Sequence, residues 1–434
     1  MFRSIRQCAR IAQLCVVCTL FGICLWQARE ARVAPFSVAA VPSGAPTAAA
    51  DAPRIESYFA SSTFHRHVHS ASISPLSDGG LIAAWFAGSR EGAHDVNIHA
   101  ARFDAENRSW GDEFRLISRE ATERMLQRNI RKLGNPVIAL APDDRLWLFY
   151  VSVSLGGWAG SAINTMYSDD DGATWSQPRR LITSPFFNIS TLVRNPPVFH
   201  SDGSIGLPIY HEFLGKFAEY LYLGPDGEIV DKFRISSGDH SLQPAIVPLS
   251  DDSAVALLRN AGMAHGKVLA SFTRDRGQSW SEHVAVDPWN PNSAVAAVNE
   301  GDGDILVALN DLQDGRFRLS LYHADQDLQH WRPVAVMDES PTGEERVAED
   351  VYMQTLSARY QDVAPEPRET PSHLEQLRSE LRRRACHQGP QCEFKYEYPT
   401  LIRAPNGFFH LVYSWNNTLI KHVVFNRAWV EQGA

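Results

Sequence analysis

The chain contains Ser168-Asp169-Asp170-Asp171-Gly172-Ala173-Thr174-Trp175 and, later, Thr273-Arg274-Asp275-Arg276-Gly277-Gln278-Ser279-Trp280. Both stretches fit the pattern Ser/Thr-x-Asp-x-Gly-x-Ser/Thr-Trp. The hydroxyl and the carboxylate of this pattern can hydrogen-bond local backbone N–H groups and close a turn, and its glycine supplies a positive φ. The tryptophan can then pack back over a hairpin and bury a large apolar area. Two copies in one chain predict a repeated β unit.

Degenerate copies of the pattern extend the repeat. Residues 104–110 and 325–331 each begin with Asp and end with Trp but lack the glycine. The four tryptophans lie at positions 110, 175, 280 and 331, so the gaps between them are 65, 105 and 51 residues. The gap of 105 corresponds to about two units, and the last unit extends to Trp429. About six antiparallel units of this size predict an all-β, six-bladed β-propeller with four strands in each blade.

Short apolar segments support this count of units. Each segment follows a polar turn, which is typical of an antiparallel hairpin. The signal occurs six times, at residues 81–86, 145–150, 205–208, 253–258, 304–309 and 408–413.

One segment before the last blade does not follow the β pattern. Residues 371–385 are predicted to be helical, with Ser372 as N-cap and Glu375 at the third helical position. The helix lies within an insertion of roughly 340–395. Insertions on propellers emerge at strand ends, so this one could cover a face of the propeller or form an inert surface excursion.

The cysteines divide into two groups. Four lie at positions 8, 15, 18 and 24, within the N-terminal segment, whereas Cys386 and Cys392 are close together near the C-terminus. The close pair predicts a disulfide that closes a small loop in an oxidising compartment. A metal site formed with His387 is the alternative, although this spacing is unusual for zinc.

The N-terminus has the features of a targeting segment. Three arginines precede an apolar run from Ile11 to Trp26, which predicts a signal peptide or an uncleaved signal anchor over residues 1–26. Residues 27–54 are rich in Ala, Pro, Val and Ser and are predicted to be a flexible linker. We therefore expect residues 55–434 to form an exported propeller that is periplasmic, anchored at the inner membrane or secreted, with membrane contact only through the N-terminal segment.

Charge excludes one class of partner. The formal net charge is −9, and Arg382-Arg383-Arg384 is the longest basic run. A nucleic-acid-binding protein would need a basic surface, so we expect no nucleic-acid partner. The sequence likewise indicates no cofactor.

The repeated pattern is the Asp box of the sialidase superfamily, and the chain resembles the BNR-repeat, sialidase-like branch. The resemblance extends from about His69 to Trp429. Besides the Asp boxes, it is carried by four stretches: His69–Ile73, Gly88–Gly92 with Asp95, Leu207–Glu212, and Tyr398–Ile402 with Ile420–Val423. It implies a sialidase-like exo-glycoside hydrolase that acts on an acidic sugar of a glycan.

The resemblance implies roles for three catalytic residues. Sialidases use an aspartate as acid/base and a tyrosine, activated by a glutamate, as nucleophile. Asp95, which follows the strand that ends near Arg90, matches the acid/base. Tyr398 matches the nucleophile, with Tyr396 as an alternative on the same strand face, and Glu212 matches the activating glutamate. A neutral phenol suits an anionic sugar because it avoids the repulsion that a carboxylate nucleophile would meet.

The resemblance also implies a cationic grip on the substrate carboxylate. Sialidases use three arginines, and a guanidinium matches a carboxylate because both groups are planar. Arg259 is one match, and Arg316 or its neighbour Arg318 is another. Arg90 is a further candidate for substrate binding.

The chain departs from the family at the first of these arginines. Typical members begin with an Arg-Ile-Pro strand, but this chain reads His65-Arg66-His67-Val68-His69. Arg66 is displaced from the arginine position, and His69 is nearest to it. Three histidines on one strand face could bind a metal, but no fourth ligand is evident, so we predict no metal site. His69 and Tyr398 would also suit a polysaccharide lyase or an atypical hydrolase, and a non-catalytic carbohydrate-binding propeller is the third hypothesis.

Overall fold

The computed structural model describes residues 15–19, 33–38, 52–184, 188–213, 215–238, 240–262, 266–301, 303–363, 371–386 and 390–433. The chain divides into two compact units, residues 1–33 and 34–434. Of the expected targeting segment, only residues 15–19 are described, and they are helical and exposed. Within the described ranges, no helix is long and apolar enough to cross a membrane.

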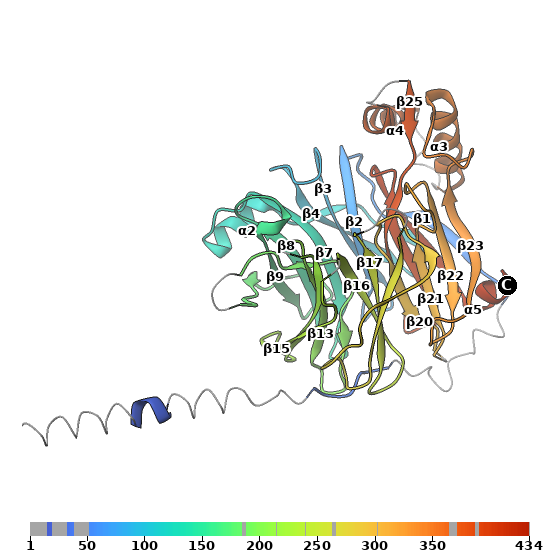
Figure 1. Cartoon of the computed structure of the whole chain (residues 1–434). Coiled ribbons are helices and arrows are strands. Elements are labelled where there is room, and N and C mark those ends of the chain that lie inside the picture. Colours follow the sequence, from blue (N-terminus) through green and yellow to red (C-terminus); the bar gives the residue numbers. More distant parts are fainter. Residues whose placement is uncertain are drawn as a thin grey trace, which may run out of the picture. The chain divides into compact units, whose positions relative to one another are not determined.

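The second unit is a six-bladed β-propeller, as the spacing of the repeats predicts (Figure 1). Each blade is an antiparallel sheet, and in the first five blades the strands follow one another in the chain. Blade 1 contains β2 (His67–Pro75), β3 (Leu81–Gly88), β4 (Asn97–Asp104), β5 (Ser109–Trp110) and β6 (Phe114–Ile117); blade 2 contains β7 (Lys132–Leu140), β8 (Leu146–Val153), β9 (Ser161–Ser168) and β10 (Arg179–Arg180); blade 3 contains β11 (Leu192–Val193), β12 (Val198–Phe199), β13 (Ile205–His211), β14 (Phe217–Leu223) and β15 (Ile229–Arg234).

The last blade closes the ring with strands from both ends of the propeller. Strand β1 (Ile55–Phe59) pairs antiparallel with β28 (Leu419–Phe425), with Ile55 opposite Phe425 and Phe59 opposite Lys421. The N-terminal strand thus completes the last blade and ties the two ends of the propeller together. Blade 4 contains β16 (Ser241–Pro248), β17 (Ala254–Asn260), β18 (Lys267–Thr273) and β19 (Val284–Trp289); blade 5 contains β20 (Ala296–Asn299), β21 (Ile305–Leu309), β22 (Arg318–Ala324) and β23 (Trp331–Glu339); blade 6 contains β26 (Tyr396–Arg403), β27 (Phe409–Trp415), β28 and β1.

The six turn-and-strand signals of the sequence each begin the second strand of a blade. These strands are β3, β8, β13, β17, β21 and β27. Their side chains are almost entirely buried, because both faces of each strand pack against neighbouring blades. In the turn before β3, the Asp78 carboxylate accepts the Gly80 N–H at 2.8 Å, and Asp202 accepts the Ser204 N–H at 2.9 Å before β13. The repeated turns are therefore closed by a local side chain.

The two Asp boxes have the same hydrogen-bond pattern. Ser168 Oγ accepts the Gly172 N–H at 2.7 Å, and Thr273 Oγ1 accepts the Gly277 N–H at 3.0 Å. The indole N–H of each tryptophan donates to the carbonyl of the box glycine, at 3.1 Å for Trp175 and 2.9 Å for Trp280. The polar groups of the boxes are thus used to form turns.

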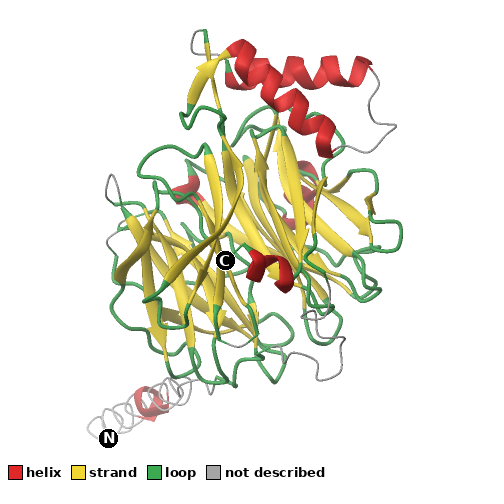
Figure 2. Cartoon of the chain, turned by 90° about the vertical axis from the view of Figure 1, so that its right-hand side faces the viewer, coloured by secondary structure: helices red, strands yellow, loops and turns green. Residues whose placement is uncertain are grey.

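The insertion before the last blade contains a short hairpin and two helices. Its elements are β24 (Arg346–Ala348), α3 (Glu349–Val363), α4 (Pro371–Ala385) and β25 (Gln391–Glu393). The predicted helix is α4, which begins at Pro371 and so includes Ser372, whereas α3 was not predicted. The predicted disulfide joins Cys386 to Cys392, and His387 lies outside the described residues. Figure 2 shows both helices beyond one end of the propeller strands.

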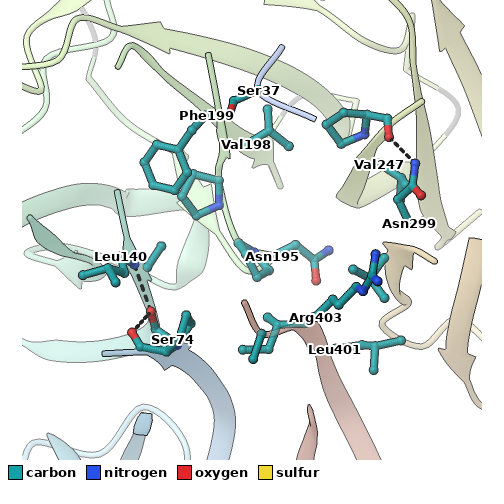
Figure 3. Close-up of a pocket in the computed structure, with 18 of the residues that line it drawn as sticks. Ser37, Ser74, Leu140, Asn195, Val198, Phe199, Val247, Asn299, Leu401 and Arg403 are labelled. Carbon is teal, nitrogen blue, oxygen red and sulfur yellow. Dashed lines mark hydrogen bonds between the residues drawn. The ribbon is translucent and has the colours of Figure 1, made fainter. Parts of the chain in front are cut away.

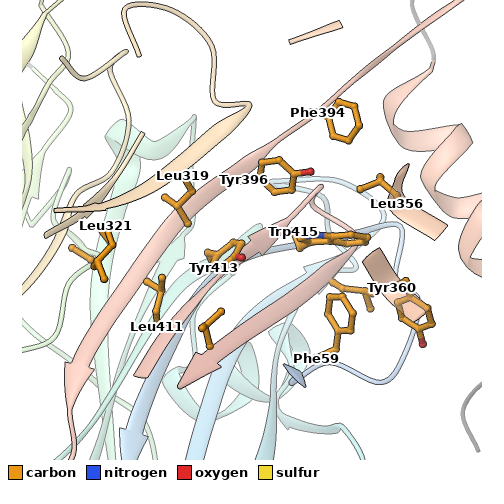
Figure 4. Packing of buried hydrophobic residues seen from close by; sticks show 14 of the residues in the cluster. Phe59, Leu319, Leu321, Leu356, Tyr360, Phe394, Tyr396, Leu411, Tyr413 and Trp415 are labelled. Atoms are coloured by element: carbon orange, nitrogen blue, oxygen red, sulfur yellow. The ribbon is translucent and has the colours of Figure 1, made fainter. Parts of the chain in front are cut away.

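A large apolar cluster joins this insertion to the propeller (Figure 4). Phe59 of β1 stacks on Tyr360 of α3, with ring centroids 5.2 Å apart, and meets Trp415 edge-on at the same distance. Leu356 of α3 is fully buried in the same cluster. The insertion is therefore packed onto blades 5 and 6 through its own apolar face.

Part of the expected linker lies against the propeller. Residues 33–38 and 52–54 are its described residues. Phe36 is buried, stacks on His200 of blade 3 at 5.0 Å and forms an isolated β-bridge with it. Three further short segments complete the helices: α2 (Arg119–Leu126), the 3-10 helix η2 (Trp158–Gly160) and α5 (Arg427–Gln432).

Candidate functional site

The predicted site residues all lie at one end of the propeller. The innermost strand of each blade begins at this end and the second strand returns to it, so the β3–β4, β13–β14 and β21–β22 connections lie there as well. The insertion emerges from the same end, which we call the site end. The Asp boxes follow the third strands and lie at the opposite end, which we call the Asp-box end. The predicted site residues that lie at the site end are Arg66, His69, Arg90, Asp95, Glu212, Arg259, Arg316 and Tyr398.

A β-bulge at the start of several innermost strands places side chains at the centre of this end. In β26 the register shifts between Glu397 and Thr400, and Tyr398 has φ 57°. Strands β2, β7 and β16 carry the same irregularity, with positive φ at Ser70, Asn135 and Gln243. A bulge leaves one residue out of the ladder and changes the direction of its side chain.

Tyr398 is the residue around which the predicted groups meet. Its phenol oxygen accepts hydrogen bonds from Arg259 Nη1 at 3.3 Å and from Gln243 Nε2 at 3.4 Å. The His69 ring centroid lies 4.1 Å from the Tyr398 ring centroid. Both hydrogen bonds point to the oxygen on which negative charge would develop if Tyr398 acted as a nucleophile.

Two arginines are held side by side next to this tyrosine. Arg259 Nε donates to the Asn292 side-chain oxygen at 2.6 Å, and Arg316 Nη2 donates to the Asn292 carbonyl at 2.8 Å. The Arg316 guanidinium carbon lies 5.9 Å from the Tyr398 ring centroid. Asn292 therefore links the two cations, and sequence reasoning did not identify it. Two guanidinium groups in this arrangement can bind a carboxylate.

The buried carboxylate of Glu397 pairs with one of these two arginines. This carboxylate forms an ion pair with Arg316 at 2.5 Å and accepts a hydrogen bond from Asn417 Nδ2 at 3.0 Å. Burial alone would raise the pKa of Glu397, but the charge of Arg316 and the hydrogen bond from it hold this pKa well below its usual range. The carboxylate is therefore ionised at neutral pH and fixes the Arg316 side chain.

His69 is buried and neutral at neutral pH. Burial lowers the pKa of its imidazole, and the nearby Glu397 carboxylate only partly opposes this effect. Its Nδ1 lies 2.9 Å from Asn417 Oδ1 and 3.8 Å from Glu397 Oε1. A neutral imidazole in contact with a tyrosine can accept a proton.

Arg194 is a buried arginine at the site that sequence reasoning missed. It donates to Thr400 Oγ1 at 2.9 Å and to the Pro399 carbonyl at 2.7 Å, and its guanidinium carbon lies 5.1 Å from the Tyr398 ring centroid. Burial lowers the pKa of Arg194 to about 10, so it remains positive at neutral pH. It holds the backbone of the bulge that carries Tyr398.

The structure resolves two alternatives. Tyr396 lies in the apolar cluster and accepts a hydrogen bond from Arg359 at 2.8 Å, so Tyr398 is the tyrosine at the site. Arg318 pairs with Asp311 at 2.8 Å, so Arg316 is the arginine beside Tyr398.

Four of the predicted residues form no hydrogen bond or ring contact with Tyr398 in the described structure. The Asp95 carboxylate accepts hydrogen bonds from Ser89, at 3.0 Å from its N–H and 2.8 Å from its hydroxyl, and is exposed. Arg90 and Arg66 are exposed as well. Glu212 is half-buried at the site end, but among the described residues it forms no hydrogen bond with Tyr398. Burial raises the pKa of Glu212, although the Arg259 charge acts in the opposite direction.

A second group of residues lies on blades 1 and 2 at this end. The Lys132 ammonium lies 3.8 Å from the centre of the Trp158 ring, whose indole N–H donates to Glu91 at 3.1 Å. Burial lowers the pKa of Lys132, and the Glu91 charge opposes this. An aromatic ring next to charged side chains is suited to contact a sugar, and sequence reasoning assigned no role to these three residues.

A signal for the central residues was nevertheless present in the sequence. A polar or aromatic residue directly precedes proline at the inner edge of four blades, within β7, β16 and β26 and between β11 and β12. The four pairs are Asn135-Pro136, Asn195-Pro196, Gln243-Pro244 and Tyr398-Pro399. Proline cannot donate to a strand ladder and is common at bulges, so these pairs mark where the innermost strands deviate from regular pairing.

A cavity of about 600 Å³ lies toward the Asp-box end (Figure 3). Its wall is mostly apolar and includes Val198, Phe199, Val247 and Leu401. The amide of Asn195 on this wall already donates to the backbone carbonyls of residues 243 and 244. None of the predicted site residues lines this cavity.

The suggestion that three histidines share one strand face is wrong for His65. This residue precedes β2 and contacts His99 and Glu113 instead, whereas His67 and His69 stack on each other at 5.5 Å. Burial acts to raise the pKa of Glu113, but hydrogen bonds with His65 and His99 lower it to about 2.

Comparison with known proteins agrees with this architecture. The model of the BNR repeat-like domain matches residues 79–411. Among solved structures, the Hadza microbial sialidase Hz136 is similar with a TM-score of 0.60 at 14% identity, over 83% of this chain and 66% of that one. A protein of unknown function from Dyadobacter fermentans gives 0.58 at 10% identity, over 86% and 98% of the two chains. The leech intramolecular trans-sialidase gives 0.57 at 13% identity, over 87% and 70%.

These identities are low enough that the similarity to solved structures shows the fold alone. No curated protein matches the sequence. The family model covers most of the propeller, including the region from the first blade to β27. The chain therefore belongs to the BNR repeat-like domain family and has the propeller fold of the sialidases.

Proposed function

We propose that this protein is a sialidase-like exo-glycoside hydrolase that removes a terminal acidic sugar from a glycan outside the cytoplasm. The observation that carries the proposal is the placement of Arg259 and Arg316 beside the Tyr398 phenol. Two cations next to a nucleophilic oxygen suit a sugar whose carboxylate is attached to, or close to, the reacting carbon. The similarity to structures of sialidases supports the same class of substrate.

In this proposal, Arg259 and Arg316 bind the sugar carboxylate and bring the anomeric carbon to Tyr398. The Tyr398 oxygen attacks that carbon while Asp95 donates a proton to the leaving glycosidic oxygen. Glu212 accepts the phenol proton as the bond forms. Water then cleaves the sugar–tyrosine bond, with Asp95 acting as the base. This sequence requires Glu212 to reach the phenol in the substrate complex, since the two groups form no hydrogen bond in the described structure.

A second candidate is a lyase that acts on a uronate-containing polysaccharide. The observation that favours it is the contact between the neutral His69 and Tyr398. His69 would remove the proton next to the sugar carboxylate, and the C–O bond on the adjacent carbon would break to leave a double bond. Tyr398 would donate its proton to the departing oxygen.

Product analysis separates the two reactions. The full chain is incubated with sialosides and with uronate-containing oligosaccharides, and products are followed by mass and by ultraviolet absorbance. A hydrolase adds water to its products, whereas a lyase forms an unsaturated uronate that absorbs in the ultraviolet. An absorbing product with no gain of water would overturn the hydrolase proposal.

Paired tyrosine variants test the role of Tyr398. Tyr398→Phe should abolish turnover in either mechanism, whereas Tyr167→Phe, an exposed tyrosine on β9, should leave it unchanged. Asp95→Ala should stop hydrolysis yet preserve sugar binding. If the wild-type protein shows neither hydrolase nor lyase activity but binds acidic sugars, the propeller is a carbohydrate-binding module and the proposed catalytic function is wrong.

A further inference from the structure

We propose that His65, His99 and Glu113 form a binding site for a divalent transition-metal ion of the zinc type at the junction between the first and last blades. The site is separate from the Tyr398 group and does not depend on the proposed glycosidase activity. From the sequence, none of these three residues was assigned a role in binding a glycan.

The geometry of the three side chains carries the proposal. His65 Nε2 lies 2.5 Å and His99 Nδ1 lies 2.8 Å from the same oxygen, Glu113 Oε1. The two imidazole rings are 4.6 Å apart and inclined at 64°. All three donor atoms lie within 4.8 Å of one another. A zinc ion with bonds of about 2.0–2.2 Å to nitrogen and oxygen could bridge donors at such separations after small movements.

The donor set also fits this class of metal. Two neutral imidazoles and one carboxylate bind zinc in known catalytic sites, where a water molecule or substrate occupies the fourth position. Glu113 is nearly inaccessible, with 2% of its side chain exposed, whereas His65 and His99 are 21% and 13% exposed. A metal ion could therefore enter from the histidine side and keep a fourth position toward solvent.

Other histidine–carboxylate pairs in the described structure lack this arrangement. The Glu219 carboxylate near His211 is already neutralised by Lys232 at 3.1 Å and Arg234 at 3.6 Å. His330 and Asp325 form an exposed pair at 2.7 Å with no second imidazole. Within the described ranges, the His65 cluster is the one in which three such donor atoms converge.

The position of the cluster indicates what the metal would do. His65 lies in the connection between β1, which completes the last blade, and β2, which begins the first. His99 lies on β4, and Glu113 directly precedes β6. The Glu113 N–H donates to Ser62 Oγ at 3.1 Å in the same connection. A bound ion would thus fasten the closing connection to the outer strands of blade 1.

Metal titration tests the proposal. The full chain is stripped with a chelator, its thiols are alkylated so that the N-terminal cysteines cannot bind metal, and zinc is then titrated by calorimetry. We expect one zinc ion per chain and a rise in Tm on binding, because an ion that binds the folded state stabilises it. Cobalt should give visible absorption bands of a low-coordinate N and O site.

Two ligand variants and one control test the ligand set. His99→Asn and Glu113→Gln should weaken zinc binding by more than the roughly 10- to 100-fold that loss of an outer-shell partner costs, and should remove the cobalt bands. His330→Asn removes a histidine from a comparable pair and should change neither. The Tm of each variant in chelator shows whether it still folds. Absence of zinc binding by the wild type, or unchanged binding in the folded His99→Asn and Glu113→Gln variants, would overturn the proposal.

Discussion

The two ends of the propeller use their polar residues in different ways. At the Asp-box end, the polar side chains hydrogen-bond their own turns, as Ser168 and Thr273 do, and the same pattern recurs from blade to blade. At the site end, polar side chains from different blades meet, as Arg259, Arg316 and Glu397 do around Tyr398. A turn is formed by residues close together in the sequence and can therefore recur in each blade. A binding site instead needs side chains of different chemistry around one ligand. The repeated motif therefore supports the fold, whereas the irregular end brings together the residues that we propose for catalysis.

The largest effect is expected from removing a cation at the site end. Arg259→Ala should lower kcat/KM on an acidic substrate by about 100-fold or more, because a charged donor to the reacting group is lost. Arg403→Ala removes an arginine from the wall of the cavity toward the other end and should leave kcat/KM within about 3-fold of the wild type, well under 1 kcal/mol. Steady-state kinetics on purified variants measures both. Equal losses from the two substitutions would remove the distinction between the ends.

Loss of the buried carboxylate should have the next largest effect. Glu397→Ala leaves the Arg316 cation without its partner at 2.5 Å, and we expect the free energy of unfolding to fall by about 3 kcal/mol. Glu339→Gln removes a half-exposed carboxylate that lies 3.4 Å from Arg318 and should cost less than about 1 kcal/mol. Urea denaturation measures the difference. Similar costs would show that Glu397 is not an essential support of the site.

A substitution at the Asp-box end should change stability but not catalysis. Gly277 has φ 91°, and an added Cβ would lie 2.7 Å from Tyr220, so Gly277→Ala should cost about 2 kcal/mol. Gly79 has φ 85° with open space around it, so Gly79→Ala isolates the backbone term at about 1 kcal/mol. Denaturation and kinetics are measured on the same preparations. A fall in kcat per folded molecule for either variant would contradict the assignment of this end to structure.

An effect that is absent at neutral pH and appears only in acid concerns stability at the site end. Burial lowers the pKa of His67 from 6.5 to about 2, with His69 adding to the effect, and neither ring nitrogen has a hydrogen-bond partner among the described residues. Above pH 6.5 the His67 ring is neutral in both the folded and the unfolded state. Below pH 6.5 the unfolded chain gains a proton at His67 that the folded protein does not bind, so the free energy of unfolding falls as the pH is lowered. His67→Leu should reduce this slope by about 1.4 kcal/mol per pH unit well below pH 6.5. Urea midpoints between pH 6 and 4 test this, and an unchanged slope would mean that His67 is protonated in the fold.

The propeller could be predicted because its signals are local. Each Asp box and each polar turn is formed by residues within a few positions of one another, as in Ser168–Trp175. Their spacing along the chain is enough to count the blades. Helix α3 was not predicted because its buried residues pack against partners that are remote in sequence, as Tyr360 does against Phe59 of β1.

The site could be predicted only in part. Resemblance to a family identified Tyr398, Arg259 and Arg316, which the structure brings together. It left open Tyr396 or Tyr398, a choice that depends on a positive φ at a bulge. Asn292 could not be found, because its role is to hold two arginines from two different blades.

The sequence by itself determined the number and order of the blades and the disulfide pair, since these follow from turns, apolar runs and short spacings. The tertiary structure alone decided which charges meet. Glu397 contacts Arg316 across 81 residues, and His65 contacts Glu113 across 48. The physical reason is that closing the ring places residues from different blades together, and ion pairs and hydrogen bonds depend on distance in space rather than along the chain.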